Sequence, residues 1–187
     1  MKDKVQRPAW AEIDLTAVAH NMKQLRRITD VRASFMAVVK ANAYGHGAVP
    51  ISRTVLENGA DYLGVAILDE ARELRESGIK APILILGYTP ADQAEETVQL
   101  ELAQTVYTVE AAQALSSAAV KLGKKVKIHV KIDTGMGRLG FLTDIGAPEE
   151  LAKIAELPGI QIDGILTHFA VADILDKDYT YQQYERF

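Results

Sequence analysis

The sequence predicts an α/β protein built around a mostly parallel β-sheet. Short apolar runs rich in β-branched residues recur along the chain and alternate with segments of helical periodicity. The connections between these segments are a few residues long, and residues 83–86 form an unbroken apolar run, as in strands that are buried on both faces. These observations indicate repeated βαβ units, which suit either a closed barrel or an open doubly wound sheet.

The amino-terminal part is expected to form a strand, a helix and a second strand. Residues 10–15 alternate as a strand does, and Thr16 is predicted to cap the helix that follows. Apolar residues recur at helical spacing in that helix as far as Ile28. Residues 35–39 are uniformly apolar, which predicts a buried strand.

Glycine, proline and threonine mark the ends of the remaining elements. Gly59 and Gly78 follow two predicted helices, at the position where a left-handed cap is common. Thr89 and Thr108 are the predicted caps of two further helices, and Pro148 opens another. The later strands are predicted over residues 62–66, 83–86, 104–107, 126–133 and 162–167. The later helices are predicted over residues 48–58, 69–77, 89–100, 108–123, 148–158 and 178–187.

Composition excludes several classes of function. The 187 residues are 48% hydrophobic, as in one ordinary globular domain, and the formal charge of −4 without any basic run predicts no nucleic-acid partner. Residues 1–10 lack the apolar segment of a secretory signal, and no run is long enough to span a bilayer, so we expect a cytoplasmic protein with no membrane partner. The chain has no cysteine, and His20, His46 and His129 make no metal-ligand spacing, so no catalytic metal is predicted.

The strongest candidate for chemistry is Lys40, at the carboxyl end of the strand predicted over residues 35–39. This end of a parallel strand is where α/β sheets place their active sites. Gly45 and Gly47 permit a turn after the lysine, and desolvation by its apolar neighbours would favour a free amine that can form a Schiff base. For a lone lysine, the alternative of a side chain that simply reaches solvent is the commoner one.

Two further segments place polar residues at the same edge. The strand over residues 126–133 alternates, with Lys131 and other polar side chains on one face, and a loop with three glycines around Arg138 follows it. Such a loop is either a flexible connection with a solvent-facing arginine, or a segment whose backbone and arginine lie close to a planar ligand. His168 follows the strand over residues 162–167, where a structural, hydrogen-bonded histidine is the alternative.

The segment VVKANAYGHG (residues 38–47) resembles the pyridoxal 5'-phosphate (PLP) signature of alanine racemases, and the resemblance extends through KIDTGMGRLG (residues 131–140) and THFA (residues 167–170). It implies that Lys40 carries PLP as a Schiff base and serves as one catalytic base. Tyr44 would hydrogen-bond the cofactor phosphate. Arg138 would contact the phenolic oxygen of the cofactor and orient the substrate carboxylate. His168 would belong to the hydrogen-bond network beside the pyridine ring, and the residue matching Lys131 is carbamylated in some members.

The resemblance also implies a fold and a function. The family has an eight-stranded TIM-type α/β barrel followed by a β-rich domain, so residues 1–187 would be the amino-terminal portion of the barrel, with about six of its strands and without the carboxyl-terminal domain. Its members are homodimers that interconvert L-alanine and D-alanine for peptidoglycan, and the partner subunit supplies a tyrosine as second base. We therefore expect the chain by itself to be inactive. Two alternatives remain open, a non-catalytic PLP-binding barrel and a silent folding fragment.

Overall fold

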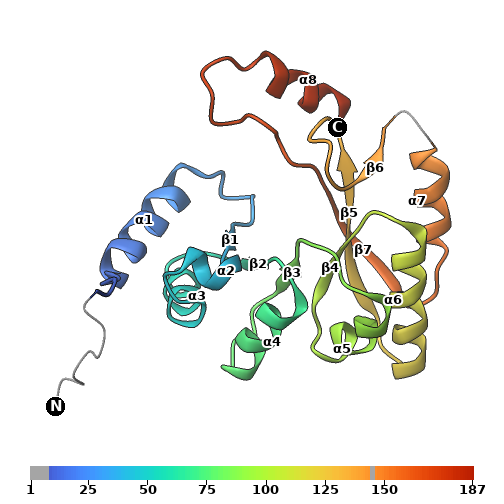
Figure 1. Ribbon diagram of the computed structural model, residues 1–187, viewed down its shortest axis with the longest axis horizontal. Helices are drawn as coiled ribbons and strands as arrows, with labels where there is room; N and C mark the ends of the chain where they lie inside the picture. The colour runs from blue at the N-terminus through green and yellow to red at the C-terminus, as the bar shows by residue number, and fades with distance from the viewer. Residues whose placement is uncertain (1–8, 144–145) are drawn as a thin grey trace.

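The computed structural model describes residues 9–143 and 146–187, and a curved parallel β-sheet runs through its centre (Figure 1). In this part of the chain six strands lie in the order β1, β2, β3, β4, β5 and β7, and neighbouring strands pair in parallel. A short strand β6 pairs with the carboxyl end of β5. The strands span Met36–Val38 (β1), Tyr62–Val65 (β2), Ile83–Ile85 (β3), Ala103–Val106 (β4), Val126–Asp133 (β5), Phe141–Leu142 (β6) and Ile160–Leu166 (β7).

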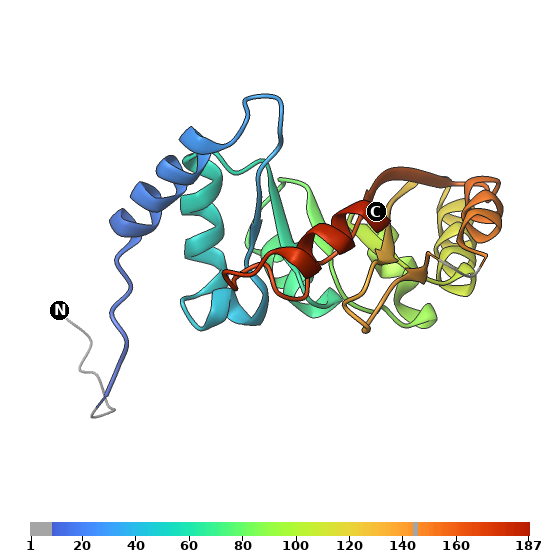
Figure 2. The ribbon, with the colours of Figure 1, turned by 90° about the horizontal axis from the view of Figure 1, so that it is seen from above.

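Helices occupy the connections between consecutive strands and pack on one face of the sheet. Neighbouring helices also contact one another, as α1 does with α3, and α6 with both α5 and α7. The helices span Leu15–Ile28 (α1), Ala48–Glu57 (α3), Leu68–Glu76 (α4), Ala94–Gln99 (α5), Val109–Leu122 (α6), Ala147–Ala155 (α7) and Asp178–Arg186 (α8), with a 3-10 turn Ala91–Gln93 (η1) before α5. Helix α8 lies above the carboxyl end of β5, and Figure 2 shows it from above, running across the sheet.

The strand register decides which side chains meet on each face of the sheet. Leu63 and Ile83 are paired in register and fully buried on the side that the helices cover, where Ile128 and Val130 of β5 are also buried. This burial supplies most of the stability of such a sheet. On β5 the intervening positions carry Lys127, His129 and Lys131, so the polar set lies on the opposite face, as the alternation predicts.

Most predicted elements are confirmed, and several of the predicted end signals act as expected. The hydroxyl oxygen of Thr108 accepts a hydrogen bond from Ala111 N at 3.2 Å and caps α6, which ends at Gly123 in the left-handed conformation. Pro148 lies in the first turn of α7. Thr89 differs, because its hydroxyl donates to Gln104 Oε1 at 2.6 Å on the neighbouring strand and caps no helix. The turn η1 begins two residues later.

The strand predicted over residues 10–15 is wrong. Residues 9–14 form no strand, and α1 already begins at Leu15. The predicted cap Thr16 is also wrong, because it lies inside the helix. Asp14 caps the helix instead, and its carboxylate accepts hydrogen bonds from Thr16 N at 2.8 Å and Ala17 N at 3.2 Å. The alternation of residues 10–15 therefore has no sheet partner to pair with, and the Trp10 side chain stays 65% exposed.

The sheet is an incomplete barrel. Among the described residues, β1 pairs only with β2, and on its outer side β7 pairs with no further strand. The six parallel strands form an arc whose outer face is covered by helices. Strands and helices alternate as in an eight-stranded α/β barrel, so the arc corresponds to six of its eight strands. No helix in the described ranges is both long and apolar enough to cross a membrane.

Candidate active site

Lys40 lies at the carboxyl edge of the sheet, directly after β1. The preceding residue, Val39, is buried, and its backbone N–H donates to Gly64 O on β2 at 2.8 Å. Lys40 itself is half-buried. The structure thus places the predicted lysine at the edge where barrel enzymes keep their catalytic groups.

The residues after Lys40 form a left-handed turn, α2 (Lys40–Tyr44). Ala41, Asn42, Ala43 and Tyr44 have φ between 51° and 55°, a conformation that costs a non-glycine residue roughly 1–2 kcal/mol each. Sequence reasoning predicted a turn from the glycines that follow, but not that four side-chain-bearing residues would adopt this backbone. Such strain persists only where surrounding contacts hold it, and it is common at functional sites.

Two side chains outside the predicted set hold this turn. The carboxylate of Glu70 accepts hydrogen bonds from Ala41 N and Ala66 N, both at 2.6 Å. Asn42 Oδ1 accepts from Ala48 N at 2.7 Å, which ties the turn to the start of α3. Sequence reasoning missed both residues. The only local signal was an acidic residue in the first turn of the helix that includes Glu70.

Lys131 is the most unusual charged residue of the site. It is 4% exposed on β5, and its Nζ has no hydrogen-bond partner among the described residues. Burial lowers the pKa of Lys131, and the positive charge of Arg138 lowers it further, while Asp133 opposes the shift. An unpaired, buried amine with a lowered pKa is more easily found in its neutral form.

Asp133 organises the loop that presents Arg138. Its carboxylate accepts hydrogen bonds from Gly135 N at 2.9 Å, Gly137 N at 3.0 Å and Arg138 N at 2.9 Å. Burial works to raise the pKa of Asp133, but these backbone donors together bring it below its usual value. Gly140 closes the loop with φ 139°, where a Cβ would lie 2.4 Å from Asp133 N, so only glycine fits there.

Helix α8 fastens the Arg138 loop to the segment that contains His168. Gln183 is fully buried, and its amide nitrogen donates to Thr134 Oγ1 at 3.2 Å and to His168 O at 3.1 Å. Its oxygen accepts from Ala170 N at 2.8 Å. Nothing in the local sequence marks this glutamine, because its partners lie far away along the chain.

The structure brings four predicted residues to one edge of the sheet. His168 is exposed as a whole, but partial burial of its imidazole lowers its pKa, as do the positive charges of Arg138, Lys131 and Lys40. Lys40 follows β1, and His168 follows β7. Lys131 lies near the carboxyl end of β5 and Arg138 lies in the loop after it, so all four residues are at the carboxyl edge of the parallel sheet. Tyr44 belongs to the turn beside Lys40, and the residue is 61% exposed.

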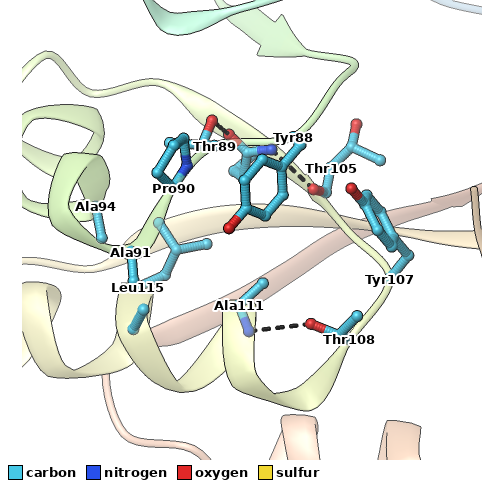
Figure 3. A pocket seen from close by; sticks show the side chains of 12 residues that line it. Tyr88, Thr89, Pro90, Ala91, Ala94, Thr105, Tyr107, Thr108, Ala111 and Leu115 are labelled. Atoms are coloured by element: carbon cyan, nitrogen blue, oxygen red, sulfur yellow. Dashed lines mark hydrogen bonds between the residues drawn. The ribbon is translucent and has the colours of Figure 1, made fainter.

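A separate small pocket lies between the loops after β3 and β4 and helices α5 and α6 (Figure 3). Its lining is mostly apolar and includes the rings of Tyr88, Pro90 and Tyr107. Burial raises the pKa of Tyr107, and Tyr88 adds to the shift. This pocket is lined by none of the four residues at the carboxyl edge, Lys40, Lys131, Arg138 and His168. Within residues 9–143 and 146–187, no group of three His, Cys, Asp or Glu side chains is arranged to hold a metal ion.

Comparison with known proteins agrees with this geometry. Residues 13–187 match the family model "Alanine racemase, N-terminal domain". The chain is 54% identical over 180 residues to an alanine racemase of Clostridium perfringens, covering 96% of this chain and 46% of that protein. It is 51% identical over 183 residues to an alanine racemase of Methanococcus maripaludis, covering 98% and 49%. The chain therefore spans about half the length of the curated relatives that it matches.

Solved structures show the same relationship. An alanine racemase from Clostridium difficile 630 superposes with a TM-score of 0.94 at 40% identity, covering 98% of this chain and 51% of the other. An alanine racemase from Bacillus anthracis with bound L-Ala-P superposes with a TM-score of 0.88 at 37% identity, covering 98% and 47%. The fold, the positions of the motifs and the extent of the match lead to one conclusion: this chain belongs to the alanine racemase family and corresponds to its amino-terminal barrel domain.

Proposed function

We propose that this chain is the cofactor-binding half of an enzyme that interconverts L-alanine and D-alanine with PLP. The observation that carries the proposal is the gathering of Lys40, Lys131, Arg138 and His168 at the carboxyl edge of the sheet. Relatives that share about half of its residues are named alanine racemases. We propose the racemase activity of these relatives for this chain, which spans about half of their length.

The residues at this edge suit PLP, which bears a phosphate and a phenolic oxygen. Lys40 would hold the cofactor covalently through Nζ, and the Tyr44 hydroxyl, exposed in the adjoining turn, would donate to the phosphate. The exposed Arg138 side chain has the planar fork that pairs well with the phenolic oxygen and with a substrate carboxylate. His168 would join the hydrogen bonds beside the pyridine ring. When bound, PLP supplies an electron sink for the charge left by the departing α-proton of the amino acid.

Racemisation requires a base on each face of the reacting carbon. With its Nζ free, Lys40 would take or return the α-proton on one face. The family resemblance assigns the opposite face to a tyrosine of the carboxyl-terminal domain of the second subunit in a homodimer. We therefore propose that the 187-residue chain alone does not racemise alanine.

We further propose that Lys131 is carbamylated. Its buried Nζ has no partner in the described part of the chain, and its lowered pKa favours the neutral amine that the reaction needs. The amine nitrogen would attack the carbon of CO₂, so that an N–C bond forms while one C–O π bond opens and a proton leaves to solvent. The resulting anion would pair with Arg138 and hold it in place.

The proposed cellular role follows from the product. D-alanine would be made in the cytoplasm by a homodimeric enzyme and used for cell-wall peptidoglycan. These points rest on the family and on the substrate, and they extend the proposal beyond the site itself.

The test of the cofactor proposal compares the unaltered chain with a Lys40→Ala variant after addition of PLP. We expect an absorbance band of lysine-bound cofactor that survives dialysis in the unaltered chain and is missing from Lys40→Ala, with Lys127→Ala as the matched control that keeps it. In the full-length protein, D-alanine formation from L-alanine tests the reaction. Cofactor binding without this reaction would favour a non-catalytic PLP-binding barrel, and no binding in either form would favour a silent folding fragment.

A further inference from the structure

Glu70 connects three parts of the fold at one point beside Lys40. It is the third residue of α4, and its two carboxylate oxygens each accept one backbone hydrogen bond at 2.6 Å. Oε2 accepts from Ala66 N, just past the end of β2, and Oε1 accepts from Ala41 N, in the left-handed turn after β1. The two carboxylate oxygens of Glu70 thus bind backbone N–H groups that follow two different strands, β1 and β2.

Helix capping explains only one of these two bonds. A glutamate at the third helical position commonly reaches back to a backbone N–H just before its own helix, as Glu70 does to Ala66 N. The bond to Ala41 N joins residues that are 29 positions apart and contributes nothing to the cap of α4. Its effect is on the turn, whose four left-handed residues need external contacts to persist.

The bond to Ala41 is one of two backbone hydrogen bonds that hold the chain on either side of Lys40. Before the lysine, Val39 N donates to Gly64 O at 2.8 Å, and after it Ala41 N donates to Glu70. The residue before Lys40 is therefore anchored to β2, and the peptide unit after Lys40 is anchored to α4. These two anchors set where the Lys40 side chain leaves the backbone.

We propose that Glu70 is a positioning residue for Lys40, acting through its carboxylate bond to the Ala41 N–H. The proposal rests on the proposed function in one respect, namely that Lys40 is the residue that bonds PLP. A covalent cofactor site demands a lysine held in a narrow range of positions, because misplacement lowers the rate at which its amine meets the cofactor carbonyl.

The same helix offers a matched control. Glu73 is exposed on α4, and its side chain has no hydrogen bond or ion pair with the described residues. Glu73→Gln therefore changes the same chemical group on the same helix without touching the turn. Glu70→Gln leaves one acceptor oxygen and points an amide donor at a backbone donor. Glu70→Asp keeps the charge at the start of α4 but shortens the reach toward Ala41.

The first measurement is hydrogen–deuterium exchange by mass spectrometry, without cofactor, on peptides that cover Ala41 and Ala66. We expect exchange at Ala41 to rise at least tenfold in both Glu70 variants and to stay unchanged in Glu73→Gln. Glu70→Asp keeps the test valid if Glu70→Gln fails to fold, because it preserves the charge at the helix start. Exchange at Ala41 that stays at the level of the unaltered chain in a folded Glu70 variant would overturn the proposal.

The second measurement is the rate at which PLP is incorporated at Lys40, followed by absorbance and checked by peptide mapping. We expect this rate to fall at least tenfold in the Glu70 variants, while Glu73→Gln matches the unaltered chain. Faster exchange at Ala41 with an unchanged incorporation rate would show a purely structural contact and would refute a positioning role. If even the unaltered chain takes up no PLP, the proposed function fails, whereas the exchange result still decides whether Glu70 holds the turn.

Discussion

The backbone N–H of Arg138 donates to Oδ2 of Asp133 at 2.9 Å, and Oδ1 of the same carboxylate accepts from Gly135 N and Gly137 N. The buried side chain of Asp133 at the end of β5 thereby stabilises the glycine-rich loop, because three backbone N–H groups of the loop donate to its carboxylate. The loop then places the positive charge of Arg138 where it lowers the pKa of both Lys131 and His168. The position of the arginine depends on a residue that sequence reasoning treated only as part of the polar face of the strand.

Replacing this carboxylate should destabilise the fold. Asp133→Asn keeps one acceptor oxygen and places an amide donor against backbone donors, so we expect the free energy of unfolding to fall by about 1–3 kcal/mol at neutral pH. Urea denaturation of the two proteins measures the difference. Asp173→Asn is the matched control, since Asp173 is exposed, and it should leave the unfolding midpoint in place. Equal midpoints for all three proteins would contradict this role.

The contribution of Asp133 should depend on pH. The folded-state pKa of Asp133 is lowered relative to its ordinary value of about 3.9, so its stabilising effect is present above that value and is lost as the pH falls through the folded-state pKa. We expect the stability difference between the unaltered chain and Asp133→Asn to be constant from about pH 7 to pH 5 and to shrink below about pH 4. Denaturation curves across this range provide the measurement. A stability difference between the two proteins that increases as the pH falls would contradict the prediction, because a lowered folded-state pKa requires the difference to decrease.

Lys40 should be the residue that bonds the cofactor. It is the lysine at a strand end that is followed by the left-handed turn with Tyr44. Borohydride reduction of the PLP-loaded chain, followed by proteolysis and peptide mapping, should locate the pyridoxyl group on Lys40. Recovery of the label on Lys127 or Lys131 would contradict the assignment of Lys40 as the residue that bonds the cofactor.

Lys131 should carry CO₂ in bicarbonate buffer. With ¹³C-labelled bicarbonate, we expect one carbamate carbon signal by NMR, because the buried amine of Lys131 has a lowered pKa and no hydrogen-bond partner in the described ranges. The signal should vanish in Lys131→Arg. It should persist in Lys127→Arg, since Lys127 lies on the same strand but is paired with Asp163 at 3.3 Å. A signal that survives in Lys131→Arg would rule out this residue as the site.

The 187-residue chain should self-associate and should not turn over alanine. Strands β1 and β7 each have an edge without a partner strand in the described residues, and Ile165 on β7 is 52% exposed. Such edges pair readily with other chains, and a lysine placed on them opposes that pairing. Sedimentation velocity at micromolar concentration should show species larger than the monomer, and Ile165→Lys should reduce them.

Val31→Lys is the control for this experiment, because Val31 is 90% exposed and lies in the loop between α1 and β1. We expect it to sediment like the unaltered chain. A strictly monomeric unaltered chain, or alanine turnover by it at the rate of a full-length racemase, would show that the fold and the second base need nothing beyond these residues.

The local pattern of residues was sufficient to predict most elements and to select the candidate residues of the site. Strand β3 was predictable because Ile83, Leu84 and Ile85 form an apolar run bounded by turn residues, and α6 because Thr108 and Gly123 act within their own helix. Lys40 and Arg138 could be selected because glycines and strand ends mark them in the sequence. These signals act between residues that are close in the sequence, so they do not depend on long-range contacts.

Long-range contacts settled the rest. Residues 10–15 alternate like a strand, yet in the described part of the chain no strand pairs with them, and the Asp14 carboxylate caps a helix instead. The left-handed turn after Lys40 runs against the backbone preference of its residues, and it persists because Glu70, 29 positions away from Ala41, holds it. Gln183 likewise has its partners in segments that precede it by many residues. A strained or buried conformation is chosen by the partners that stabilise it, and those partners become neighbours only when the strands have assembled.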